Sequence, residues 1–118
     1  MVKILIVDDE KDFLFVLGNI LKKNGFEVES QDTGDAVIEK VQQYKPHLVL
    51  LDIALDNGFD GRQICREIKN DIDSPPTVFL CSGHLRESDL EEEFDGDDFL
   101  EKPIRVPELL KKIHLHIN

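Results

Sequence analysis

The sequence predicts an α/β fold in which five parallel strands form one doubly wound sheet between layers of helices. Short apolar runs, often β-branched, alternate with longer segments whose apolar residues recur at helical spacing. This alternation favours right-handed crossovers with helices on both faces of the sheet. The chain has 118 residues and contains no repeat, linker or low-complexity stretch, so we expect a single domain over residues 1–118.

Five segments have the composition of strands. Val2–Val7 and His47–Leu51 are almost wholly apolar, as expected of strands buried on both faces. Phe26–Ser30 alternates apolar and polar residues, which predicts a half-covered edge strand. Thr77–Cys81 and Asp98–Glu101 are predicted as the fourth and fifth strands.

Five segments that follow the strands are predicted as helices. They are Asp12–Lys23, Asp35–Tyr44, Arg62–Lys69, a weaker Leu85–Phe94, and a last helix with Pro107 in its first turn. In the first helix the residues expected to face the core are Phe13, Val16, Leu17, Ile20 and Leu21. The last helix is expected to bury Leu109, Leu110, Ile113 and Ile117.

The composition restricts the classes of function. With 25 acidic and 14 basic residues the formal charge is −11, which disfavours direct binding to nucleic acid or to an anionic membrane surface. No apolar run reaches the length of a membrane span, and no signal peptide is visible. Cys65 and Cys81 have no metal-like spacing and lie among apolar residues, which predicts reduced core thiols in a cytoplasmic protein.

Polar residues that can carry chemistry stand at the carboxyl ends of the predicted strands. Asp8-Asp9 follows the first strand, Asp52 the third, Ser82 the fourth and Lys102 the fifth. The carboxyl ends of parallel strands meet at one edge of a sheet, where open α/β sheets place their functional groups. Neighbouring carboxylates resist joint ionisation unless a cation lies between them, and Mg²⁺ prefers such oxygen ligands. A lysine and a hydroxyl beside them can receive phosphate oxygens.

These segments resemble the receiver domains of two-component response regulators, which are CheY-like proteins with strand order 2-1-3-4-5. The resemblance covers nearly the whole chain. The segments that carry it are, in order, ILIVDDE, HLVLLD, FDG, VFLCSG and DFLEKP. Each is weak alone, but all five in order and at suitable spacing form a specific pattern.

The resemblance implies a Mg²⁺-dependent phosphoryl acceptor at Asp52. The carboxylate of Asp52 would attack the phosphorus of a phosphohistidine and form an aspartyl phosphate. Asp9 would bind Mg²⁺ directly and Asp8 through water. Asp52 and the backbone carbonyl of Ala54 would complete the protein ligands. Lys102 would pair with the phosphoryl oxygens.

The remaining implied roles concern signalling. Ser82 would hydrogen-bond the phosphoryl group, and Phe99 corresponds to the switch aromatic that moves inward with it. The Lys102-Pro103 peptide is expected to be cis. As a phosphoacceptor the chain would catalyse only its own phosphorylation and dephosphorylation and would not otherwise be an enzyme. Its partners would be a sensor histidine kinase or a phosphotransfer protein, and a downstream target or output domain.

The sequence departs from the family pattern in the loop after Asp52 and in the stretch between Ser82 and Phe99, which is slightly shorter than usual. The loop after Asp52, IALDNGFDG, lacks the usual Met-Pro and is one residue longer, with Asp56 at the proline position. The Gly-Ala pair that usually precedes the fifth strand is replaced by Asp95-Gly96. His84, two residues after Ser82, is a hypothetical modulator of phosphate lifetime, although a plain loop histidine is the simpler interpretation.

Other functions stay open on the sequence alone. A receiver-like interaction module that takes no phosphate is the main alternative. A phosphatase of the haloacid-dehalogenase type would need a second Asp two residues after Asp52, where Ala54 stands. A flavin-binding protein would need a glycine-rich phosphate loop after the first strand, where Asp8-Asp9 stands. Whether the chain acts alone or as the receiver of a longer regulator is not decided.

Overall fold

A computed structural model describes residues 1–83 and 96–117 and contains a five-stranded parallel sheet in the order β2-β1-β3-β4-β5. This confirms the predicted fold and strand order. The strands are β1 (Lys3–Val7), β2 (Glu27–Gln31), β3 (Leu48–Asp52), β4 (Thr77–Ser82) and β5 (Asp98–Glu101). The helices in the described ranges are α1 (Lys11–Lys23), α2 (Val37–Tyr44), α3 (Gly61–Asp71) and α5 (Val106–His116).

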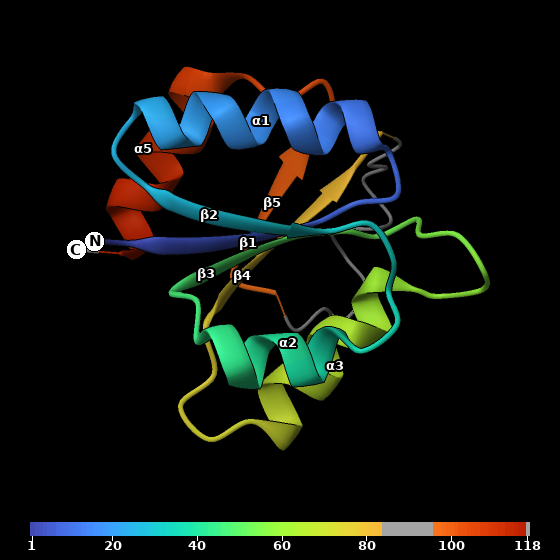
Figure 1. The fold of residues 1–118 in the computed structure, drawn as a ribbon. Helices are drawn as coiled ribbons and strands as arrows, with labels where there is room; N and C mark the ends of the chain where they lie inside the picture. The colour runs from blue at the N-terminus through green and yellow to red at the C-terminus, as the bar shows by residue number, and fades with distance from the viewer. Residues whose placement is uncertain (84–95, 118) are drawn as a thin grey trace.

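The helices cover both faces of the sheet. Figure 1 shows α1 and α5 on one face and α2 and α3 on the other. Alternate residues of the central strands therefore enter two separate cores: Ile4 and Leu48 pack under α1 and α5, whereas Leu5 and Val49 pack under α2 and α3. All five residues of β3 are buried, as its apolar sequence predicts for a central strand.

The edge strand β2 is also as predicted, because it pairs only with β1 and its residues are partly exposed.

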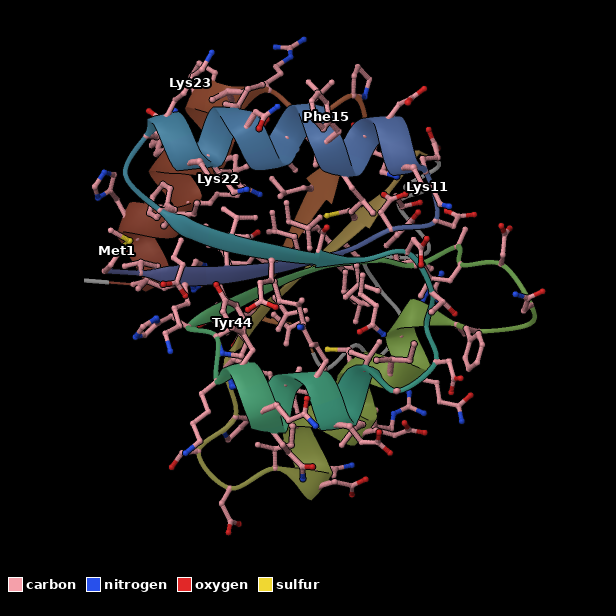
Figure 2. All side chains as sticks on the ribbon, viewed as in Figure 1. Met1, Lys11, Phe15, Lys22, Lys23 and Tyr44 are labelled. Atoms are coloured by element: carbon pink, nitrogen blue, oxygen red, sulfur yellow. The ribbon has the colours of Figure 1, made fainter. Side chains whose placement is uncertain are left out.

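Figure 2 shows Tyr44 between α2 and the sheet. The ammonium groups of Lys3 and Lys40 lie 5.5 and 5.8 Å from the centroid of its ring. Through these cation–π contacts, Tyr44 at the end of α2 binds Lys3 of β1 and Lys40 of α2.

Two details of the predicted helices are wrong, and one lies outside the described residues. Val16, expected to face the core, is 56% exposed, because Leu14 takes the inward position together with Leu17. Ala36, expected inside the second helix, precedes it in the left-handed region with φ of 58°. The predicted fourth helix, Leu85–Phe94, falls within the range that the structure does not describe.

The C-terminal helix is fixed to β5 by a group of polar contacts. Lys112 Nζ lies 2.9 Å from Asp98 Oδ1 and also donates to the carbonyl of Phe99. His116 Nε2 lies 3.1 Å from Asp98 Oδ2, and its ring meets Phe79 edge to face. Despite partial burial, hydrogen bonds from Lys112, the Phe99 amide and His116 hold the pKa of Asp98 below its usual range. Because β5 carries Phe99, α5 is tied directly to the strand of the predicted switch residue.

Both cysteines are buried and free, as predicted. Burial raises the pKa of the Cys81 thiol to about 12, which keeps it protonated. Over the described ranges, no helix has the length and apolar character that a bilayer crossing requires.

Candidate functional site

The strand ends bring the predicted polar residues together. Asp8 follows β1 directly, Asp52 is the last residue of β3, and Lys102 follows β5. These strands are hydrogen-bonded neighbours or separated only by β4, so their carboxyl ends form one rim of the sheet. Residues 94 positions apart in the chain, Asp8 and Lys102, are in direct contact at that rim.

Lys102 binds two of the carboxylates. Its Nζ lies 2.6 Å from Asp8 Oδ2 and 3.2 Å from Asp52 Oδ2. The side chains of Asp8, Asp52 and Lys102 are only 2%, 7% and 17% exposed. Low exposure strengthens these charge interactions relative to a surface ion pair. The Lys102-Pro103 peptide is cis, as predicted.

The remaining oxygen atoms of the two buried carboxylates are held by the backbone. Asp8 Oδ1 accepts from the amide of Glu10 at 2.9 Å, and Asp52 Oδ1 accepts from the amide of Ala54 at 3.1 Å. The two aspartates are therefore fixed in orientation by the first residues of the loops that follow them. A fixed carboxylate loses less freedom when it binds a ligand.

Asp8, Asp9 and Asp52 offer oxygen atoms that all lie within 4.8 Å of one another. Asp9 is half-buried and reachable, whereas Asp8 is deeper. Lys102 pairs with Asp8 and Asp52 but not with Asp9 among the ion pairs of the described residues, which leaves negative charge that a divalent ion would offset. Oxygen ligands of this number suit Mg²⁺, which keeps part of its water shell and pairs with phosphate. The donor set therefore fits the predicted ion.

Burial and the neighbouring charges have opposing effects on the pKa values of Asp52 and Lys102. Burial, with the neighbouring Asp8, raises the pKa of Asp52, although Lys102 acts in the opposite direction. Burial also disfavours the charged form of Lys102, but its contacts with Asp8 and Asp52 raise the pKa of its ammonium group. The two aspartates thus favour the charged form of Lys102, and Lys102 in turn favours the charged form of Asp52.

The other predicted residues lie around this centre. Ser82 ends β4, and its carbonyl accepts from the amide of Lys102 at 2.9 Å. Ala54 is exposed in the loop after β3, where its amide donates to Asp52 Oδ1 and its backbone forms an antiparallel bridge with Asp60. Phe99 is half-buried against the core under α2 and α3. His84, the proposed modulator of phosphate lifetime, lies outside the described residues.

The unusual loop after Asp52 is a short hairpin. Asn57 and Gly58 both have positive φ, 62° and 77°, and the amide of Phe59 faces the carbonyl of Asp56 at 3.4 Å. Positive φ at both central residues is the requirement of a type I′ turn, for which Asn-Gly is the preferred pair. The Asn57-Gly58 pair therefore closes this loop with a tight turn. It also places Asp56 beside Asp9, whose carboxyl group raises the pKa of Asp56 by hydrogen bonding and by charge.

Two functional features were missed by sequence reasoning. Gly61 packs so closely on β3 that a β-carbon there would lie 2.0 Å from the carbonyl oxygen of Asp52. The FDG segment contained this signal, but only the fold gives its reason. The ring of Phe13, assigned to the core, lies 4.5 Å from Lys102 Nζ. No local pattern indicates that contact.

Comparison with known proteins decides the family. Residues 4–114 match the family described as the response regulator receiver domain. The chain belongs to this family. Membership explains why three aspartates and a lysine gather at one rim of the sheet, and it decides against the phosphatase and flavin-binding alternatives. A receiver domain is a signalling phosphoacceptor rather than a conventional enzyme, and receiver domains interact with histidine kinases.

Solved structures of other receivers are closely similar. The BeF3-activated N-terminal receiver domain of RstA from Klebsiella pneumoniae is 28% identical, with 97% of each chain covered and a TM-score of 0.86. The response regulator TrrA from Thermotoga maritima, in complex with Mg²⁺-BeF, is 26% identical, with 99% of this chain and 100% of that chain covered and a TM-score of 0.87. A CheY-like receiver domain from Methanospirillum hungatei is 26% identical over 98% and 92% of the two chains, with a TM-score of 0.85.

These similarities agree with the chemistry of the site. The acidic triad of this receiver domain suits Mg²⁺, and a homologue has been crystallised with Mg²⁺-BeF. The chain is a phosphoacceptor receiver of the CheY-like type.

Proposed function

We propose that Asp52 is the phosphorylated residue and that the phosphoryl group comes from a phosphohistidine of a kinase or phosphotransfer protein. The observation that carries this proposal is the position of Asp52 at the centre of the site. Its carboxylate lies 3.2 Å from Lys102 Nζ, and it offers an oxygen atom close to those of Asp8 and Asp9. Lys102 opposes the rise in the pKa of Asp52 that burial causes, and so favours the carboxylate form that acts as the nucleophile.

The transfer exchanges one bond for another. A carboxylate oxygen of Asp52 forms a bond to phosphorus while the bond from phosphorus to the imidazole nitrogen of the donor breaks. The electron pair of the broken bond stays on the imidazole. Asp8, Asp9, Asp52 and the Ala54 carbonyl would hold Mg²⁺, which would supply positive charge to offset the negative charge of the phosphoryl group.

Two further side chains are assigned to the phosphoryl oxygens. Lys102 already directs its ammonium group at Asp52, so it is placed to donate to an oxygen bonded to that carboxylate. Ser82 ends the strand next to Asp52 and would donate its hydroxyl. Phe99 packs beside β4 in the register opposite Leu80, and we propose that its position changes when Ser82 binds the phosphoryl group.

Uptake of phosphate from a small donor tests the acceptor role. Incubated with acetyl phosphate and Mg²⁺, the protein is expected to gain one phosphoryl group, detected by intact-mass spectrometry. Excess EDTA should reduce uptake by about a hundredfold or more, because the charge of the transferred group is then uncompensated. Lack of any uptake in Mg²⁺ would instead favour the alternative of a receiver-like interaction module that is not phosphorylated.

The surface next to the site offers a docking place for the donor protein. A hollow of about 560 Å³ adjoins Lys102, and its other lining side chains are mainly apolar. Val16 lines it and is 56% exposed, and Phe15 on the same helix is 71% exposed. Figure 2 shows Lys11 at one end of α1, and Lys22 and Lys23 at the other. A partner that covers α1 would thus meet apolar and basic groups in an otherwise acidic chain, close to Asp52.

A charge in this hollow should separate docking from chemistry. Val16→Glu is expected to slow phosphoryl transfer from a phosphorylated histidine protein by about tenfold, because it places a charge in the contact. Uptake from acetyl phosphate should stay unchanged, because that donor needs no docking. Leu115→Glu, at a residue 70% exposed near the end of α5, is the control. Equal slowing with both donors would contradict the docking role.

A cytoplasmic location, which such a partner would require, remains a prediction.

A further inference from the structure

The ammonium group of Lys102 has a third neighbour besides the two aspartates. The ring centroid of Phe13 lies 4.5 Å from Lys102 Nζ, inside the range of a cation–π contact. Among the described residues, the cation–π contacts of Lys3 and Lys40 with Tyr44 are longer, at 5.5 and 5.8 Å. The Lys102 side chain is also less exposed than that of Lys40, at 17% against 30%.

We propose that Phe13 is a positioning residue that holds the Lys102 ammonium group at the phosphorylation site. The proposal rests on the proposed function, in which Lys102 binds the transferred phosphoryl group. Phe13 belongs to the third position of α1, and it is half-buried against the core under α1 and α5. Its ring is therefore held by the fold and does not depend on Lys102 for its own position.

The kind of neighbour matters at this point of the site. An additional carboxylate beside Lys102 would also hold the ammonium group, but it would add negative charge where the phosphoryl group must arrive. An aromatic face attracts a cation through its quadrupole and carries no net charge. Phe13 thus retains Lys102 without opposing the incoming anion.

The ring of Phe13 also lines the hollow beside the site. Phe13 and Lys102 line the same hollow, together with Val16, Ile20, Pro103 and Ile104. Because Lys102 lines the hollow, its ammonium group could turn from the aspartates into the water there if the ring were absent. Phe13 closes that route, which keeps Lys102 directed at Asp8 and Asp52.

The simpler interpretation is that Phe13 only fills the core, in which case any side chain of similar apolar size would serve. Two substitutions distinguish these interpretations. Phe13→Leu keeps an apolar side chain but removes the aromatic face. Phe13→Tyr keeps the face. Phe26→Leu is the matched control, since Phe26 is also partly buried against the core under α1 and α5 but directly precedes β2, at the opposite edge of the sheet from the site.

The first measurement is NMR of the metal-free protein. The ε-methylene protons of Lys102 should be shifted upfield by the ring current of Phe13 in the wild type, in Phe13→Tyr and in Phe26→Leu. The shift should be lost in Phe13→Leu. Ordinary lysine shifts in the wild type would overturn the proposal, and this measurement is independent of whether the protein takes up phosphate.

The second measurement is the rate of phosphate uptake from acetyl phosphate, separated into the limiting rate and the half-saturating donor concentration. Phe13→Leu should lower the limiting rate about 3- to 30-fold, with an unfolding midpoint close to that of the wild type. Phe13→Tyr should restore the rate. A normal rate in Phe13→Leu, or equal losses in Phe13→Leu and Phe13→Tyr, would overturn the proposal. If the wild type itself took up no phosphate, the proposed function would fail, and the Lys102 signals alone would decide the positioning role.

Discussion

Replacing Asp52 with asparagine is expected to abolish phosphate uptake, with a loss of about a thousandfold or more relative to the wild type. Asparagine keeps the size of the side chain and can still accept the hydrogen bond from the Ala54 amide. It lacks the anionic oxygen that forms the bond to phosphorus. Intact-mass spectrometry after incubation with acetyl phosphate and Mg²⁺ measures the result directly.

Asp56→Asn provides the control for this substitution. It removes an acidic group from the same loop, beside Asp9, at a fully exposed position. Uptake should persist in Asp56→Asn, with at most a severalfold increase in the Mg²⁺ concentration that is required, because one negative charge near the ion is lost. Full uptake by Asp52→Asn would mean that another carboxylate is the acceptor.

The same Asp52→Asn variant should be more stable than the wild type in the absence of metal. Because the fold raises the pKa of Asp52, the folded state binds this proton more tightly than the unfolded state. The contribution of Asp52 to stability is therefore complete below its unfolded pKa and is lost as the pH rises through its folded pKa. We expect asparagine to gain on the order of 1 kcal/mol at neutral pH, a gain that diminishes in acid and in Mg²⁺. Chemical denaturation at several pH values measures this difference.

Gly61→Ala is expected to destabilise the fold by on the order of 3–5 kcal/mol, the second large effect. The new β-carbon would lie 2.0 Å from the carbonyl oxygen of Asp52 and 2.8 Å from the α-carbon of Ile53. Both obstacles are backbone, and the Gly61 amide also donates to the Ile53 carbonyl at 2.9 Å. Relief of the clash must move the end of β3 or the start of α3. Thermal denaturation should show a midpoint lower by roughly 10 °C or more.

Gly18→Ala is the matched control, since its β-carbon would meet only Val28 Cγ1 at an ordinary 3.9 Å. This substitution lies within α1 and is expected to be neutral or to stabilise by up to about 1 kcal/mol. If the folded Gly61→Ala protein can be isolated, its phosphate uptake should also fall, because the displaced peptide carries the Asp52 carboxylate away from Lys102. Equal stability of the two glycine variants would contradict the close approach seen at Gly61.

The sequence predicted the strands and the rim residues because these depend on local composition. A run such as that of β3 is apolar throughout, and a central strand buried on both faces requires this. A polar residue at its end, Asp52, then stands where the strand leaves the core. The strand order followed from the family resemblance and is confirmed. Helical periodicity wrongly predicted that Val16 is buried. Val16 lines the hollow between α1 and the start of α5 and is 56% exposed.

The sequence by itself determined the fold class, the edge position of β2 and the set of acidic, hydroxyl and lysine residues that make this chain a receiver domain. Only the tertiary structure decided which of these residues touch: that Lys102 binds Asp8 at 2.6 Å, that Phe13 lies against the same ammonium group, and that Gly61 leaves no space beside Asp52. The physical reason is distance along the chain. Burial and turn preferences act between near neighbours and leave a local pattern, whereas these contacts join separate strands and helices whose relative positions are fixed only when the whole core packs.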